Sequence, residues 1–81
     1  MEDIKNRIEA VLFTTGRYVN IDELSSLCNI GSKGIVKEAL DNLIKDYKTK
    51  NSALEIIEEN NKFKLNIKRE YLYLTTKLLD E

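Results

Sequence analysis

Residues 54–67 read LEIIEENNKFKLNI, two alternating apolar and polar runs that meet at Asn60-Asn61. Asparagine tolerates positive φ, which a two-residue hairpin turn requires, so this pattern predicts an antiparallel hairpin. One face is predicted to hold the pairs Glu59 with Lys62, Ile57 with Lys64 and Glu55 with Asn66. The other face then holds the pairs Glu58 with Phe63, Ile56 with Leu65 and Leu54 with Ile67. A single hairpin is not stable alone, so we expect its more apolar face to cover other elements.

Three amphipathic helices are predicted before the hairpin, because apolar residues recur there at helical spacing. The first covers residues 3–15, the second begins after Asn20 and ends at residues 29–31, and the third covers residues 33–48. Their apolar stripes are, in chain order, Ile4, Ile8, Val11 and Leu12; Ile21, Leu24 and Leu27; and Val36, Leu40, Leu43 and Tyr47, with Ala39 and Ile44 beside them. The predicted N-caps are Asp3, Asn20 and Ser32, and Gly16 is predicted to end the first helix.

Two further elements complete the expected topology. Residues 17–19 are predicted to form a third strand beside the hairpin, and residues 69–79 a final helix with Tyr71, Leu74 and Leu78 on one side. Helix, helix, helix and hairpin, in that order, are typical of a winged helix-turn-helix. We therefore predict an α+β fold with three helices, a two-stranded wing plus a short third strand, and a C-terminal helix. The length suits a single winged-helix domain over residues 1–81.

The composition is that of a globular protein, with 42% apolar and 33% charged residues. The longest apolar runs, such as residues 10–13, are far shorter than the ~18 residues that a membrane span needs. The first residues are charged and lack the hydrophobic region of a signal peptide. We therefore expect a cytoplasmic protein with no membrane partner.

The sequence holds no recognisable catalytic or metal site. It has no histidine, the commonest general base, and its three glycines do not have the spacing of a phosphate-binding loop. The acidic residues Glu55, Glu58 and Glu59 alternate between two faces of a strand, so we expect a solvated wing and no metal. Cys28, the single cysteine, is interpreted as a buried apolar filler. We predict no enzymatic activity, no cofactor and no small-molecule substrate.

The third helix is the segment that would enter the major groove of DNA in a helix-turn-helix protein. Its candidate DNA contacts are Lys33, Lys37, Lys45 and Lys48. The alternative is that Lys37, Asp41 and Lys45 form ion pairs at i, i+4 spacing on a solvated face. The net charge of −1, the acidic wing and the absence of arginine from this face favour that alternative. A small DNA-binding transcriptional regulator remains the second hypothesis, with DNA contact otherwise weak or indirect.

Some large apolar residues do not fit a single core. Phe13 points away from the stripe of the first helix, Ile57 lies on the outer face of the hairpin, and Tyr73 lies opposite the main stripe of the last helix. Together with Leu72, these residues indicate a surface for protein contact. We assign Phe13, Leu72 and Tyr73 to self-contact and Ile57 to contact with another protein.

Several runs, taken in order, resemble the first winged-helix domain of the segregation and condensation protein B (ScpB) family. They are residues 8–13, Gly16, Val19, residues 22–24, 39–40, Leu43, Tyr47, and residues 54–58, 63–65 and 70–71. The resemblance implies a non-enzymatic subunit of the prokaryotic SMC–kleisin complex, which condenses and segregates chromosomes in cell division. It also implies association with the nucleoid, dimerisation, and binding of the kleisin subunit, ScpA.

The chain departs from the family pattern in three ways. Family members usually carry two tandem winged helices, and this sequence matches the first. Asn60-Asn61 stands at the wing tip where the family often has glycines. Arg17-Tyr18 stands where an acidic residue and a proline are common. We do not expect either substitution to change the fold.

Overall fold

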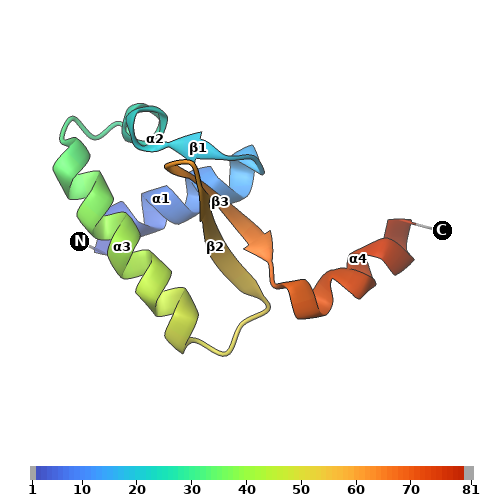
Figure 1. The fold of residues 1–81 in the computed structure, drawn as a ribbon. Helices are drawn as coiled ribbons and strands as arrows, with labels where there is room; N and C mark the ends of the chain where they lie inside the picture. The colour runs from blue at the N-terminus through green and yellow to red at the C-terminus, as the bar shows by residue number, and fades with distance from the viewer. Residues whose placement is uncertain (1, 80–81) are drawn as a thin grey trace.

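Three helices and a small antiparallel sheet form the body of the protein, and a fourth helix projects from it (Figure 1). This is a computed structural model, which describes the backbone of residues 2–79 and the side chains of residues 2–76. The elements are α1 (Glu2–Thr15), β1 (Val19–Asn20), α2 (Ile21–Leu27), α3 (Lys33–Thr49), β2 (Leu54–Glu59), β3 (Lys62–Ile67), the 3-10 helix η1 (Arg69–Tyr71) and α4 (Leu72–Leu79). Their order confirms the predicted winged helix-turn-helix.

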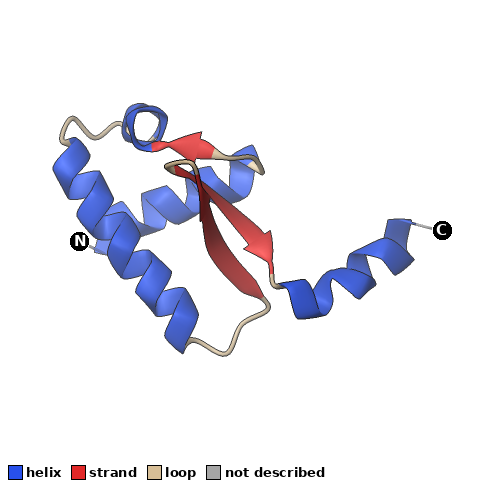
Figure 2. Ribbon diagram, viewed as in Figure 1, coloured by secondary structure: helices blue, strands red, loops and turns tan. Residues whose placement is uncertain are grey.

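The hairpin forms in the predicted register. All six pairs are present, from Leu54 with Ile67 to Glu59 with Lys62. Asn60 and Asn61 have φ values of 52° and 61°, so both turn residues adopt the left-handed conformation that a tight hairpin needs. The strand order is β1-β3-β2, which leaves β2 at the edge of the sheet (Figure 2).

The third strand is shorter and starts later than predicted. Pairing with β3 begins at Val19 and includes Asn20, whereas residues 17–18 lie outside the strand. Gly16 has a φ of +60° just before this segment. The guanidinium of Arg17 donates to the Tyr18 carbonyl and to the Glu23 carboxylate, which connects residue 17 to α2.

The core lies between the three helices and the inner face of the sheet. The buried apolar residues are Ile8, Leu12, Val19, Leu24, Cys28, Val36, Ala39, Leu40, Leu43, Tyr47 and Phe63. This set contains the whole predicted stripe of α3, and it confirms Cys28 as a buried residue, whose pKa burial raises. Leu54, Ile56 and Leu65 pack against the cluster from the wing, as their alternation predicted.

Two of the three predicted helix caps are present. Asn20 Oδ1 accepts from the Glu23 amide at 2.8 Å, and Ser32 Oγ accepts from the Ile35 amide at 3.2 Å. The Asp3 cap is wrong, because α1 begins one residue earlier at Glu2 and places Asp3 inside the first turn. There the Asp3 carboxylate pairs with Arg7 at 3.0 Å.

Leu27 also differs from its prediction, since its side chain is 50% exposed. Leu24 and Cys28, four residues apart, occupy the core face of this short segment and turn Leu27 outward. Ser25 is buried in its place and donates a hydrogen bond to the Ile30 carbonyl. The helical spacing identified the segment but misplaced its buried face by about one residue.

The C-terminal helix leaves the body of the domain (Figure 1). The single helix predicted over residues 69–79 is instead a 3-10 turn followed by α4, because the Tyr71 amide bonds to the Lys68 carbonyl three residues back. The main contacts of α4 are with η1. Its residues Leu72, Tyr73 and Leu74 are exposed, and the side chain of Leu78 lies outside the described residues. No helix in the described part of the chain is long and apolar enough to cross a bilayer.

Candidate functional site

The lysines of α3 are partly neutralised by carboxylates. Lys33 Nζ lies 2.8 Å from Asp22, and Lys37 Nζ lies 3.1 Å from Asp41 and 5.2 Å from the centre of the Phe63 ring. The first of these ion pairs connects α3 to α2, and the second is one of the pairs predicted along α3. A second predicted pair, between Asp41 and Lys45, is not found among the described residues. Lys45 and Lys48 are exposed. Among the residues that the structure describes, the face that a helix-turn-helix presents to DNA therefore carries two lysines paired with carboxylates and two for which no ion pair is found.

The outer face of the wing carries an ordered polar cluster. Tyr18 donates to Glu59 Oε2 at 3.3 Å, and Lys64 Nζ lies 5.7 Å from the centre of the Tyr18 ring. Burial raises the pKa of Tyr18, and the negative charge of Glu59 adds to this shift. Ile57 pairs with Lys64 on this outer face, as predicted, and its side chain is half-buried there. Its cross-strand neighbour is Lys64, whose Nζ lies over the Tyr18 ring.

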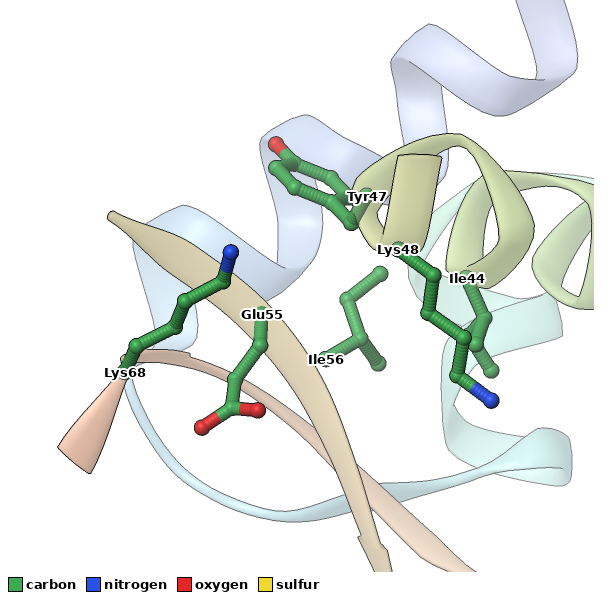
Figure 3. A pocket seen from close by; sticks show the side chains of 6 residues that line it. All are labelled: Ile44, Tyr47, Lys48, Glu55, Ile56 and Lys68. Carbon is green, nitrogen blue, oxygen red and sulfur yellow. The ribbon is translucent and has the colours of Figure 1, made fainter. Parts of the chain in front are cut away.

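A hollow of about 220 Å³ lies between the C-terminal half of α3 and the edge strand β2 (Figure 3). Ile44 and Ile56 supply its apolar surface, while Lys48, Glu55 and Lys68 supply its charged groups. Tyr47 completes the lining. Two lysines and one glutamate give this hollow a net positive charge. No group of acidic, cysteine or histidine side chains suited to hold a metal ion occurs among the described residues.

An apolar concave surface lies between α1 and the sheet, beside Phe13. Two adjoining hollows of about 330 and 270 Å³ share Phe13, Leu54 and Leu65, and together we name them the Phe13 groove. Its other lining residues are Asn6, Glu9, Ala10, Tyr47, Asn66 and Ile67.

The Phe13 groove has a polar boundary on one side. The hydroxyl of Tyr47 donates a hydrogen bond to the Glu9 carboxylate. Burial and this carboxylate raise the pKa of Tyr47 to about 12. The ring of Phe13 is 74% exposed, so its aromatic face is available to a partner.

The predicted interface residues do not form one patch within a protomer. Phe13 lines the groove, Leu72 and Tyr73 lie on the projecting α4, and Ile57 lies on the outer face of the wing. We name Leu72, Tyr73 and Leu74 together the α4 surface. The groove is lined by Leu54, Leu65 and Ile67, which the sequence placed on the inner face of the hairpin. Alternation identifies that inner face, but it does not show how much of the face the helices cover.

These observations define a class of protein: a winged-helix domain whose DNA-facing lysines are partly neutralised and whose apolar residues are exposed on α1 and α4. The chain belongs to the ScpB family. The family model described as "Segregation and condensation complex subunit ScpB" matches residues 6–81.

Individual relatives agree with this assignment. Segregation and condensation protein B of Clostridioides difficile (strain 630) is 33% identical over 81 residues. That alignment covers 98% of this chain and 45% of the relative, so the chain spans about half the length of the curated relative that it matches.

Two solved structures share the fold. The crystal structure of a dimer of the ScpB N-terminal domain complexed with ScpA peptide has a TM-score of 0.81 at 22% identity, and the match covers 95% of each chain. The crystal structure of a conserved hypothetical protein from Chlorobium tepidum has a TM-score of 0.75 at 23% identity. That match covers 96% of this chain and 49% of the other. The likeness confirms the winged-helix architecture.

Proposed function

We propose that this protein is a non-enzymatic subunit of a prokaryotic SMC complex, where it binds an ScpA-like kleisin and a second copy of itself. It would act in the cytoplasm at the nucleoid, and contact DNA indirectly or weakly. Family membership supports the complex, and the ScpA peptide in a structure of the same fold supports the kind of partner. The observation that carries the proposal is the set of exposed apolar side chains on α1 and α4. Such side chains on a small domain mark a surface for protein contact.

The mechanism is docking. Apolar contacts supply most of the binding free energy at the centre of such interfaces, while charged residues at the rim orient the partner. We assign Phe13, Leu72 and Tyr73 to the self-contact. We assign Ile57 to the kleisin contact, because it lies half-buried beside the polar cluster of Tyr18, which would supply the rim.

The rival hypothesis of a DNA-binding regulator is disfavoured by the charge balance of α3. Lys33 and Lys37 already pair with Asp22 and Asp41, which leaves Lys45 and Lys48 to contact phosphates. Two phosphate contacts predict a plot of log Kobs against log salt with a slope of roughly −2, whereas 6–10 contacts give a slope of roughly −5 to −9. Binding to duplex DNA measured across salt concentrations distinguishes the two. A slope in the steeper range would contradict the interaction-module proposal.

The direct test is capture of a kleisin fragment by the purified protein. We expect saturable binding of an ScpA-like fragment, measured by fluorescence anisotropy, and at least a tenfold weaker affinity for Ile57→Glu. The matched control is Ile35→Glu, because Ile35 is an exposed isoleucine that belongs to α3 and not to the wing. Circular dichroism verifies that both variants are folded. No binding by the wild type would refute the proposed function, and equal binding by both variants would remove Ile57 from the contact.

A further inference from the structure

Strand β2 lies at one end of the strand order β1-β3-β2, so one of its two edges has no neighbouring strand in the described part of the chain (Figure 2). Such an edge presents N–H and C=O groups that can pair with another chain. We propose that this edge binds an extended peptide segment by antiparallel strand addition, and that the segment combines basic and apolar residues in a fixed alternation. The inference goes beyond the proposed function, because it defines the ligand by its sequence pattern and the site by a strand edge.

The register of the hairpin identifies the backbone groups that point out of this edge. In a hairpin with a two-residue turn, the residues beside the turn exchange two hydrogen bonds, and bonded pairs then alternate along the strands. Residues 55, 57 and 59 therefore bond to β3, while the N–H and C=O groups of Ile56 and Glu58 point outward. The Leu54 amide follows the same alternation, since it donates to Ser52 Oγ at 3.1 Å and not to β3. Ile56 and Glu58 thus offer two N–H and two C=O groups to an added strand.

The outer face of this edge selects positively charged side chains. Glu55, Ile57 and Glu59 alternate along it, and on β3 the residue opposite Glu59 is already a lysine, Lys62. No ion pair of Glu55 or Glu59 is found among the described residues. Side chains directly opposite each other on neighbouring strands attract when their charges are opposite. The complementary segment therefore has basic residues opposite Glu55 and Glu59, and an apolar residue opposite Ile57.

The inner face of the edge selects an apolar residue at one position. The residue paired with Ile56 would lie beside the hollow between α3 and β2, where Ile44 and Ile56 supply apolar surface (Figure 3). This hollow has a volume of about 220 Å³, and an apolar cavity of about 150 Å³ is large enough to hold benzene. Lys48 and Lys68 also line it and repel a positive side chain there. Read from the turn end of β2 to its start, the segment therefore has the pattern basic, polar, apolar, apolar, basic.

The charge of β2 disfavours a second copy of this chain as the occupant. Two β2 strands can pair antiparallel with Ile56 of one copy opposite Glu58 of the other, which uses the outward groups of both residues in each copy. That register also sets Glu55 opposite Glu59 twice. Like charges directly opposite each other destabilise strand pairing. The occupant is therefore a segment of another protein with the basic and apolar pattern given above.

Fluorescence anisotropy with a synthetic peptide tests the pattern. The probe is Lys-Thr-Val-Val-Lys with a threonine at each end, labelled with fluorescein and amidated. We expect saturable binding to the purified wild type. Binding should be roughly tenfold weaker for a probe with glutamates in place of both lysines, and for Val-Lys-Thr-Lys-Val, which has the same composition with its lysines on the inner face. No binding of the first probe, or equal binding of all three, would overturn the inference.

Two variants of Glu58 test the backbone of the edge. Proline is tolerated on an edge strand where its nitrogen faces solvent, so Glu58→Pro removes one outward N–H and keeps the bonds to β3. Glu58→Ala is the matched control, because it removes the same carboxylate and keeps the N–H. We expect Glu58→Pro to bind the probe roughly tenfold more weakly than Glu58→Ala, with circular dichroism showing that both are folded. Equal binding by the two folded variants would overturn the inference.

A charge exchange gives a second test that leaves the backbone unchanged. Glu55→Lys should bind a probe whose last lysine is replaced by glutamate more tightly than it binds the original probe, and wild type should show the opposite preference. The same preference in both proteins would overturn the inference. Kleisin capture is scored separately. Wild type that captures the kleisin fragment and not the probe refutes strand addition alone, and wild type that binds the probe and not the kleisin fragment refutes the proposed function alone.

Discussion

Leu12 and Phe13 are neighbours in α1 with opposite surroundings, and alanine substitution at each position tests which face of the helix is core. Leu12 is 0% exposed and belongs to the same cluster as Ile8 and Leu40. Truncating a fully buried leucine removes its transfer free energy and leaves a cavity, at a cost of roughly 2–5 kcal/mol. A domain of 81 residues has a total stability of roughly 4–12 kcal/mol. We therefore expect Leu12→Ala to remove a large fraction of the free energy of unfolding.

Phe13→Ala should behave differently. The ring is exposed in one protomer, so its truncation should change the intrinsic free energy of unfolding by no more than about 0.5 kcal/mol. A dimer adds stability that depends on protein concentration, and Phe13→Ala should remove that added part. Urea unfolding followed by circular dichroism, at protein concentrations spanning two decades, separates the two contributions.

The outcome that would refute this reasoning is specific. If Phe13→Ala lowers stability as much as Leu12→Ala, and does so equally at every protein concentration, then Phe13 is buried within a single chain. In that case α4 covers Phe13 in its own protomer. Both the description of Phe13 as an exposed residue and its assignment to the self-contact would then be wrong.

Three further predictions concern local interactions. Asn20→Ala removes the side-chain acceptor of the Glu23 amide, so it should lower stability by about 1 kcal/mol in urea unfolding. Asn61→Gly should raise the thermal midpoint, because φ at this turn residue is +61° and glycine adopts that conformation without steric cost; Asn51→Gly, in a loop outside the turn, should not. The folded pKa of Tyr47, about 12, lies above its ordinary value of 10.0, so its stabilising contribution is complete below pH 10 and is lost as pH rises toward 12. Tyr47→Phe should therefore reduce the fall in stability between pH 9 and 11, and an unchanged slope would contradict that assignment.

The wing could be predicted in detail because its apolar alternation and its turn residues fit only one strand register. A shift of one residue would have moved Phe63 and Leu65 to the solvent face, and Asn60-Asn61 fixed the loop length at two residues. The buried face of α3 was equally clear, since a long helix repeats its stripe over several turns. Short elements gave weaker signals. The seven residues of α2 complete fewer than two turns, so helical spacing alone did not show that Leu27 faces solvent.

The features that could not be predicted depend on contacts between distant segments. Ile57 alternates onto the outer face as expected, but alternation alone did not show that its side chain is half-buried there. The sequence likewise predicted an apolar C-terminal helix, but it did not show that this helix leaves the body of the domain. The Lys68 amide, just before that helix, bonds to the Ala53 carbonyl, a contact between distant segments that has no signature in the helix itself.

The open groove and the projecting helix have one structural cause. The bond between Lys68 and Ala53 ends β3 opposite the start of β2, and the 3-10 turn that follows sends α4 outward. The inner face of the sheet at Leu54 and Ile67 is then left without the helix that would otherwise cover it. The Phe13 groove is therefore uncovered, and α4 packs mainly against η1.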